Sequence, residues 1–149
     1  MKRTGVAICT MLLGASAVMA DQQLAVQQDK LMRTMGEGVY VTFLKMGKGD
    51  IPYDQAKVDA ALAELEKDAP TIPTVFATDP KEQVINTTYG YSDKIWQNKA
   101  DFDSKVPPVL AAIASLKGKI KDQASVKVAF DTMHKNCSGC HETYRLKLK

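Results

Sequence analysis

The sequence is poor in cysteine, histidine and tryptophan, and it has no strong charge of either sign. Its 149 residues include three cysteines, two histidines and one tryptophan. Because three is an odd number, a disulfide framework that uses every cysteine is excluded. The 20 basic and 17 acidic residues give a formal charge of +3, which is not the basic stripe that nucleic-acid binding requires. Apolar residues make up 45% of the chain, enough for one globular domain.

The N-terminus has the three-part pattern of a secretory signal peptide. Two basic residues precede an uncharged, largely apolar stretch over residues 6–18, and Ala17 and Ala20 place small side chains at the −3 and −1 positions of a cut after Ala20. The apolar stretch is shorter than the about 20 residues that a transmembrane helix needs, which disfavours an uncleaved anchor. We therefore predict a cleaved signal over residues 1–20, a mature domain over residues 21–149 without membrane insertion, and a periplasmic location.

Cleavage of the signal peptide changes the cysteine count and the net charge of the chain. Cys9 leaves with the signal, so Cys137 and Cys140 are the cysteines that remain. Lys2 and Arg3 leave as well, and the formal charge falls from +3 to +1. Net charge then gives no argument for an anionic partner, and a single pair of cysteines remains to be explained.

The dominant period of the mature chain is helical. Apolar residues recur at spacings of three and four, including Leu31, Met35, Val39 and Phe43, and predict a helix over about residues 22–47. Asp54 is a suitable N-cap for a second helix that ends before Pro70.

The rest of the chain predicts one long connection and two more helices. Residues 69–92 contain several prolines and show no helical period, so we expect a structured connection whose apolar side chains pack on the core. A third helix should begin near residue 92 or 93 and kink or restart at Pro107 and Pro108. Asp122 or Ser125 should cap the last helix. With no strand alternation present, the predicted fold is an all-α antiparallel four-helix bundle.

One pentapeptide in the last helix carries chemistry: Cys137-Ser138-Gly139-Cys140-His141. In an exported protein, C-x-x-C-H is typical of covalent c-type haem attachment. Residues three apart lie on one face of a helix, so both thiols can reach the two vinyl groups of one haem. His141 follows directly and can present its imidazole to the iron as the proximal ligand.

Three other interpretations of the cysteine pair are weaker. A redox dithiol usually lies at a helix start beside a strand, whereas this motif lies near the end of an all-helical chain. A structural disulfide would suit an oxidising compartment. A zinc site would lack ligands, because His134 is the one histidine outside the motif and a single helix face cannot complete a tetrahedron.

With these features in place, the chain resembles the cytochrome c prime family. The segment CSGCHETYR over residues 137–145 is similar to that family's C-x-x-C-H-x-x-[FY]-R ending, and Pro52-Tyr53-Asp54 is another family feature. Residues 95–96, 102–103 and 117–122 look most like the low-spin members, which place a methionine on the iron. The resemblance covers essentially the whole mature chain and implies a four-helix bundle with one covalent haem c.

The resemblance also implies which residue binds the iron on the distal side of the haem. Lys30-Leu31-Met32-Arg33 matches the segment that supplies the distal methionine, so Met32 is the expected iron ligand, with core packing as its ordinary alternative. Met35, one turn away, is the rival. Arg145 is expected near the proximal imidazole, or else as a solvated cation at a helix C-terminus.

The expected function is single-electron transfer by a periplasmic haem protein that is not an enzyme and acts with redox partner proteins. A different class is a five-coordinate haem protein that binds nitric oxide or carbon monoxide, which requires Met32 to leave the iron free. A third is a dithiol oxidoreductase without haem. The chain is expected to be a monomer or a homodimer.

Overall fold

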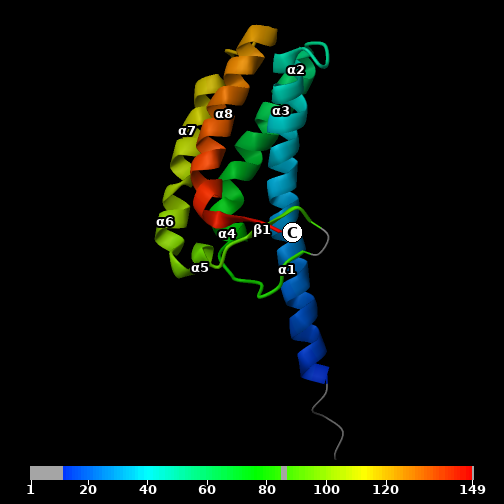
Figure 1. Ribbon diagram of the computed structural model, residues 1–149, viewed down its shortest axis with the longest axis vertical. Coiled ribbons are helices and arrows are strands. Elements are labelled where there is room, and N and C mark those ends of the chain that lie inside the picture. Colours follow the sequence, from blue (N-terminus) through cyan, green and yellow to red (C-terminus); the bar gives the residue numbers. More distant parts are fainter. Residues whose placement is uncertain (1–11, 85–86, 149) are drawn as a thin grey trace, which may run out of the picture.

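The structure is a computed structural model that describes residues 12–84 and 87–148. Residues 1–11, and with them most of the predicted signal peptide and Cys9, lie outside the described residues. The fold is the expected four-helix bundle, with four helical rods side by side (Figure 1). Within the described part of the chain, no helix has both the length and the apolarity needed to cross a bilayer.

The first rod differs from the expected single helix over 22–47. It consists of α1 (Leu12–Gly36), a π-helix η1 (Glu37–Leu44) and α2 (Lys45–Lys48). Helix α1 begins at Leu12, well before residue 22. The leucines, methionine and alanines of the predicted signal region are themselves good helix formers. The π-helix buries Val39 and Phe43. Apolar residues spaced three and four apart do not reveal a π-helix. A π-helix differs from an α-helix in its hydrogen-bond register rather than in its residue types.

The second rod and the connection after it follow the prediction closely. Asp54 caps α3 (Gln55–Asp68) by accepting a hydrogen bond from the Lys57 backbone N–H at 3.1 Å. A short 3₁₀ turn, η2 (Ala69–Thr71), and the single turn α4 (Ile72–Val75) then bury Ile72 against the core. The remainder of the connection is irregular up to residue 88 in its described part.

The third rod is divided, and the fourth is continuous. The third contains α5 (Lys94–Gln97), α6 (Lys99–Ser104) and α7 (Val106–Leu116), with prolines in the first turn of α7, where a proline needs no N–H partner. The fourth is α8 (Gln123–Tyr144), which begins with a capping box between Asp122 and Ser125. Both expected features, the restart at the prolines and the cap, are confirmed.

A two-stranded antiparallel ribbon was not expected from the sequence. Strand β1 (Tyr89–Tyr91) pairs with β2 (Arg145–Lys147), with Gly90 opposite Leu146. Flanking hydrogen bonds run from the Ser92 N–H to the Tyr144 carbonyl and from the Leu148 N–H to the Thr88 carbonyl, both at 2.9 Å. Three-residue strands are too short for an alternating pattern, so the pairing is visible only in three dimensions. The ribbon ties the chain end to the long connection.

Candidate functional site

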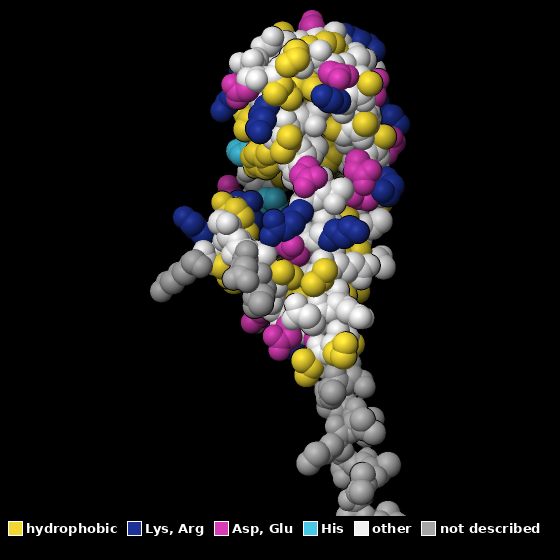
Figure 2. Space-filling model, turned by 90° about the vertical axis from the view of Figure 1, so that its right-hand side faces the viewer, with side chains coloured by type: hydrophobic (Ala, Val, Ile, Leu, Met, Phe, Trp, Pro, Cys, Tyr) yellow, Lys and Arg dark blue, Asp and Glu magenta, His cyan; other side chains and the backbone are white. Residues whose placement is uncertain are grey.

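The C-x-x-C-H motif occupies the last two turns of α8 and lines a cavity of about 500 Å³. Cys137, Cys140 and His141 are all partly buried, and all three line the cavity. Both cysteines are free. Figure 2 shows a hollow on one face of the molecule, with a histidine side chain (cyan) inside it and Lys and Arg side chains beside it. The helical spacing predicted from the sequence therefore directs the three functional side chains into one space.

The first rod supplies another part of the cavity wall, through Met32 and Met35 of α1. Met35 is buried, with 7% of its surface exposed, whereas Met32 is partly buried and packs against the core. Both candidate distal ligands thus line the same cavity as the motif, although they come from the opposite end of the sequence. Which of them is a ligand stays a prediction.

Burial sets the protonation state of the motif histidine. Burial, with the Arg145 cation and His134 as further causes, lowers the pKa of His141 to about 4. The imidazole is therefore neutral at pH 7. A neutral imidazole nitrogen is the form that binds a metal.

Burial has the opposite consequence for the two thiols. It raises the pKa of Cys137, and it raises the pKa of Cys140 to about 11, with the neighbouring Cys137 as a further cause. A thiol–disulfide catalyst needs a lowered pKa, so that an attacking thiolate is present at neutral pH. The motif also lies at the C-terminal end of α8, where the helix dipole disfavours a thiolate. These properties count against the dithiol interpretation.

Two contacts hold the end of α8 in place beside the cavity. The Tyr144 hydroxyl, almost fully buried, donates a hydrogen bond to Asp101 of α6 at 2.5 Å, and this bond raises the pKa of Tyr144 to about 12. The guanidinium of Arg145 lies over the Tyr89 ring, 4.3 Å from its centroid. Arg145 is exposed yet lines the cavity, so the two expectations for it, a position near the cofactor and a solvated cation, are not exclusive.

The cavity fits a porphyrin bound through the motif. Its volume lies within the about 300–1,000 Å³ typical of sites for small molecules and cofactors. Aromatic side chains that sequence reasoning did not assign to the site form much of its wall, namely Phe76, Tyr91 and Phe102. Within the described residues there is no cluster of three or more His, Cys, Asp or Glu side chains that could hold a metal ion alone. The two thiols and the neutral imidazole on one helix face suit an iron carried by a planar macrocycle.

Sequence reasoning also missed Gln28, which is fully buried in α1 and lines the cavity. A single polar residue in a predicted amphipathic helix is usually assigned to the solvent-exposed face, so the helical pattern alone does not place Gln28 in the site. The available signal was its spacing: Gln28 lies four residues before Met32 and seven before Met35, on the same helix face.

Comparison with known proteins assigns the family. A family model described as Cytochrome C' matches residues 23–145. Relatives include cytochrome c-555 of Bradyrhizobium diazoefficiens, 58% identical over 149 residues and 100% of both chains. Cytochrome c-556 of Rhodopseudomonas palustris is 38% identical over 148 residues, 99% of each chain.

Solved structures agree with this result. Cytochrome c' from Rhodopseudomonas palustris has a TM-score of 0.72 at 32% identity, covering 85% of this chain and 98% of that one. The structural model of oxidised cytochrome c556 from the same organism has a TM-score of 0.58 at 32% identity, covering 91% and 99%. The bundle and its cavity thus define a helical haem protein of the c type. More specifically, the chain belongs to the cytochrome c prime family, whose cofactor is one covalently bound haem c.

Proposed function

We propose that this protein is a periplasmic electron carrier whose haem is attached through Cys137 and Cys140 and bound axially by His141 and Met32. The observation that carries the proposal is the cavity, which is lined both by the motif of α8 and by the methionines of α1. The names of the relatives, cytochromes c-555 and c-556, also support an electron carrier. When bound, the haem supplies an iron that alternates between the ferric and ferrous states.

The chain's own residues attach and tune that cofactor. Cys137 and Cys140 would hold the haem through thioether bonds, each formed by adding S–H across a vinyl double bond, so attachment would need no oxidant. His141, being neutral, would bind the iron without first losing a proton. The thioether of Met32 would be the other iron ligand, and a His/Met pair would raise the reduction potential. Electron transfer then requires docking of redox partner proteins, with the chain as a monomer or a homodimer.

Export is the second part of the proposal. The family model begins to match at residue 23, so the proposed signal peptide over residues 1–20 lies outside the match. The residues at its end, Val18 and Met19, are 60% and 65% exposed, and the described core begins at Ala25, so a cut after Ala20 removes no described core residue. Intact-mass measurement of the exported protein should give a chain that begins at Asp21 and carries one haem.

The spectrum of the purified protein tests the axial ligands. Met ligation predicts a sulfur-to-iron charge-transfer band at the red end of the ferric spectrum and sharp, split ferrous bands. In Met32→Ala we expect conversion to high spin and rapid carbon monoxide binding, whereas Met35→Ala should keep the low-spin spectrum. If Met35→Ala loses the charge-transfer band instead, the ligand is Met35.

A broad high-spin spectrum of the unmodified protein would support the alternative function, a five-coordinate haem protein that binds nitric oxide or carbon monoxide. A pyridine haemochrome measurement on protein made with the cytochrome c maturation machinery tests the cofactor itself. Absence of covalent haem would contradict both functions.

A further inference from the structure

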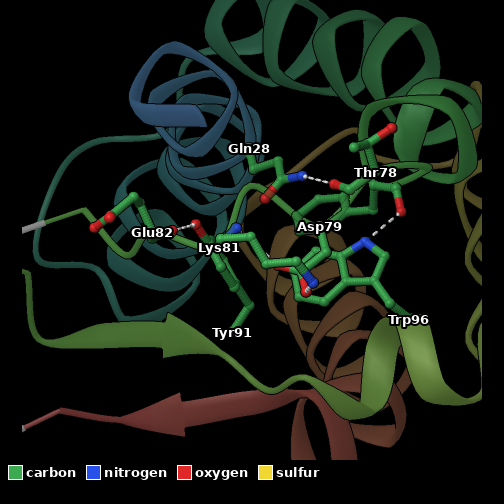
Figure 3. A network of polar contacts seen from close by, with 8 residues as sticks. Gln28, Thr78, Asp79, Lys81, Glu82, Tyr91 and Trp96 are labelled. Carbon is green, nitrogen blue, oxygen red and sulfur yellow. Dashed lines mark hydrogen bonds and ion pairs between the residues drawn. The ribbon is translucent and has the colours of Figure 1, made fainter. Parts of the chain in front are cut away.

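A fully buried glutamine lies one helical turn before the proposed distal ligand. The side-chain amide nitrogen Nε2 of Gln28 donates hydrogen bonds to the backbone carbonyls of Val75 and Thr78, both at 3.1 Å. Figure 3 shows the Gln28 amide pointing toward Thr78. Because carbonyl oxygens only accept hydrogen bonds, these contacts also fix which end of the amide carries the nitrogen. Gln28 therefore ties α1 to the segment that includes and follows α4.

This tie is unusual for the first helix. Within the described residues, the other polar side-chain contact of α1 is the Arg33–Asp29 ion pair, which is internal to the helix. Gln28 is thus the side chain through which α1 makes hydrogen bonds to another element. Nearby, Ala25 and Met35 are buried and add only apolar contacts, which resist rotation of a helix less strictly than directional hydrogen bonds do.

The buried amide is also incompletely satisfied. Its oxygen Oε1 has no hydrogen-bond partner in the structure. An unpaired buried acceptor is destabilising, and this cost offsets part of what the two donated hydrogen bonds contribute. The net gain in stability from Gln28 is therefore small, which leaves room for a role in the site.

The N-terminal part of α1 has less support than its C-terminal end, which is continuous with η1 and the packing of η1 on α3 and α8. At its C-terminal end α1 runs directly into the π-helix η1, an uncommon helical form that often marks functional sites. At its N-terminal end, the proposed cleavage after Ala20 would leave about two helical turns before Gln28. Gln28 therefore adds a directional contact to the apolar packing of α1 on α3 and α4, at a position one turn before Met32.

We propose that Gln28 is a positioning residue, which holds α1 so that the Met32 thioether stays within bonding distance of the haem iron. This inference rests on the proposed function, because it takes Met32 to be the distal ligand. Gln28 does not bind the iron in this scheme. It acts through the backbone of α1, one turn away.

The test compares two glutamine-to-methionine changes in the same helix. Gln28→Met removes the two donated hydrogen bonds while keeping side-chain length. Gln27→Met is the matched control, since Gln27 is exposed. In holoprotein we expect Gln28→Met to show a partly high-spin ferric spectrum and a lower reduction potential. Carbon monoxide association with the ferrous form should be faster by about tenfold, which corresponds to about 1.4 kcal/mol. Gln27→Met should match the unmodified protein.

A double variant separates positioning from a general structural effect. If Gln28 acts through Met32, the carbon monoxide rate of Gln28→Met/Met32→Ala should equal that of Met32→Ala, because the ligand that Gln28 positions is already absent. If the effects of the two substitutions on the carbon monoxide rate add instead, the inference is overturned. Gln28→Asn provides a second variant if Gln28→Met does not fold. It keeps the amide but shortens it, and a wild-type spectrum and rate in Gln28→Asn would count against positioning.

The two proposals fail in different ways. If Met32→Ala becomes high-spin while Gln28→Met keeps the wild-type spectrum, rate and potential, the positioning role is wrong and the ligand assignment stands. If Met32→Ala stays low-spin, the ligand assignment is wrong and the role of Gln28 toward Met32 falls with it.

Discussion

A close approach between α2 and α8 gives a quantitative prediction. A Cβ atom added at Gly47 of α2 would lie 2.9 Å from the Lys127 Cα and 3.1 Å from the Lys127 backbone N of α8. Ordinary carbon contacts begin at about 3.5 Å, so Gly47→Ala requires α2 and α8 to separate by roughly 0.6 Å. Backbone atoms cannot move aside as a flexible side chain can. The strain must therefore be taken up by the helices themselves.

Two opposing effects set the change in the free energy of unfolding of Gly47→Ala. Overpacking of this kind costs about 1–3 kcal/mol, and replacing glycine by alanine in a helix returns at most about 1 kcal/mol. We expect a net loss of about 1–2 kcal/mol in the free energy of unfolding, or a Tm lower by roughly 2–8 °C. Far-UV circular dichroism during thermal unfolding measures the change. The visible spectrum should be unaffected, because Gly47 does not line the haem cavity.

A glycine in the same rod provides the control. At Gly38, which also does not line the cavity, an added Cβ would meet the Ala61 Cβ at 3.5 Å, an ordinary contact. Gly38→Ala should leave Tm unchanged or raise it slightly. Equal Tm values for Gly47→Ala and Gly38→Ala would refute the reasoning, because they would mean that the close approach of α2 and α8 does not limit the packing.

Two further predictions concern the buried tyrosine and the haem attachment. Burial raises the pKa of Tyr91 from 10.0 to about 12, so the unfolded chain releases this proton first. The contribution of Tyr91 to stability should be constant below pH 10 and fall as the pH rises from about 10 to about 12. Tyr91→Phe should reduce that fall in denaturant titrations, and an unchanged profile would assign it to other groups. Replacing both Cys137 and Cys140 by alanine should allow acid–acetone to extract the haem, whereas either single change should leave it attached through the remaining thioether.

Local sequence signals determined the helical class and the attachment motif. The Asp54 and Asp122 caps, the prolines at the start of α7 and the spacing of Cys137, Cys140 and His141 each act within a few residues of the chain. Such signals can be recognised in the sequence because the groups that interact are neighbours along it. The family could be recognised for the same reason, since its ending is a short continuous segment.

The π-helix and the β1–β2 ribbon were decided by tertiary contacts. Glu37–Leu44 contains residues that an ordinary α-helix would accept equally well, and its register depends on packing against α3 and α8. The ribbon joins residues 89–91 to residues 145–147, and no local pattern links segments so far apart.

The cavity was also decided by tertiary contacts. Met32 and His141 line it from opposite ends of the sequence, and the carbonyls that accept from Gln28 lie 47 and 50 residues further along the chain. The sequence by itself determined which side chains could attach and bind a haem, because those depend on residue type and short spacing. The tertiary structure alone decided that the His141 imidazole is partly buried and neutral, and that a buried glutamine ties the helix carrying Met32 to the segment after α4. Burial and hydrogen bonding depend on which distant segments pack together.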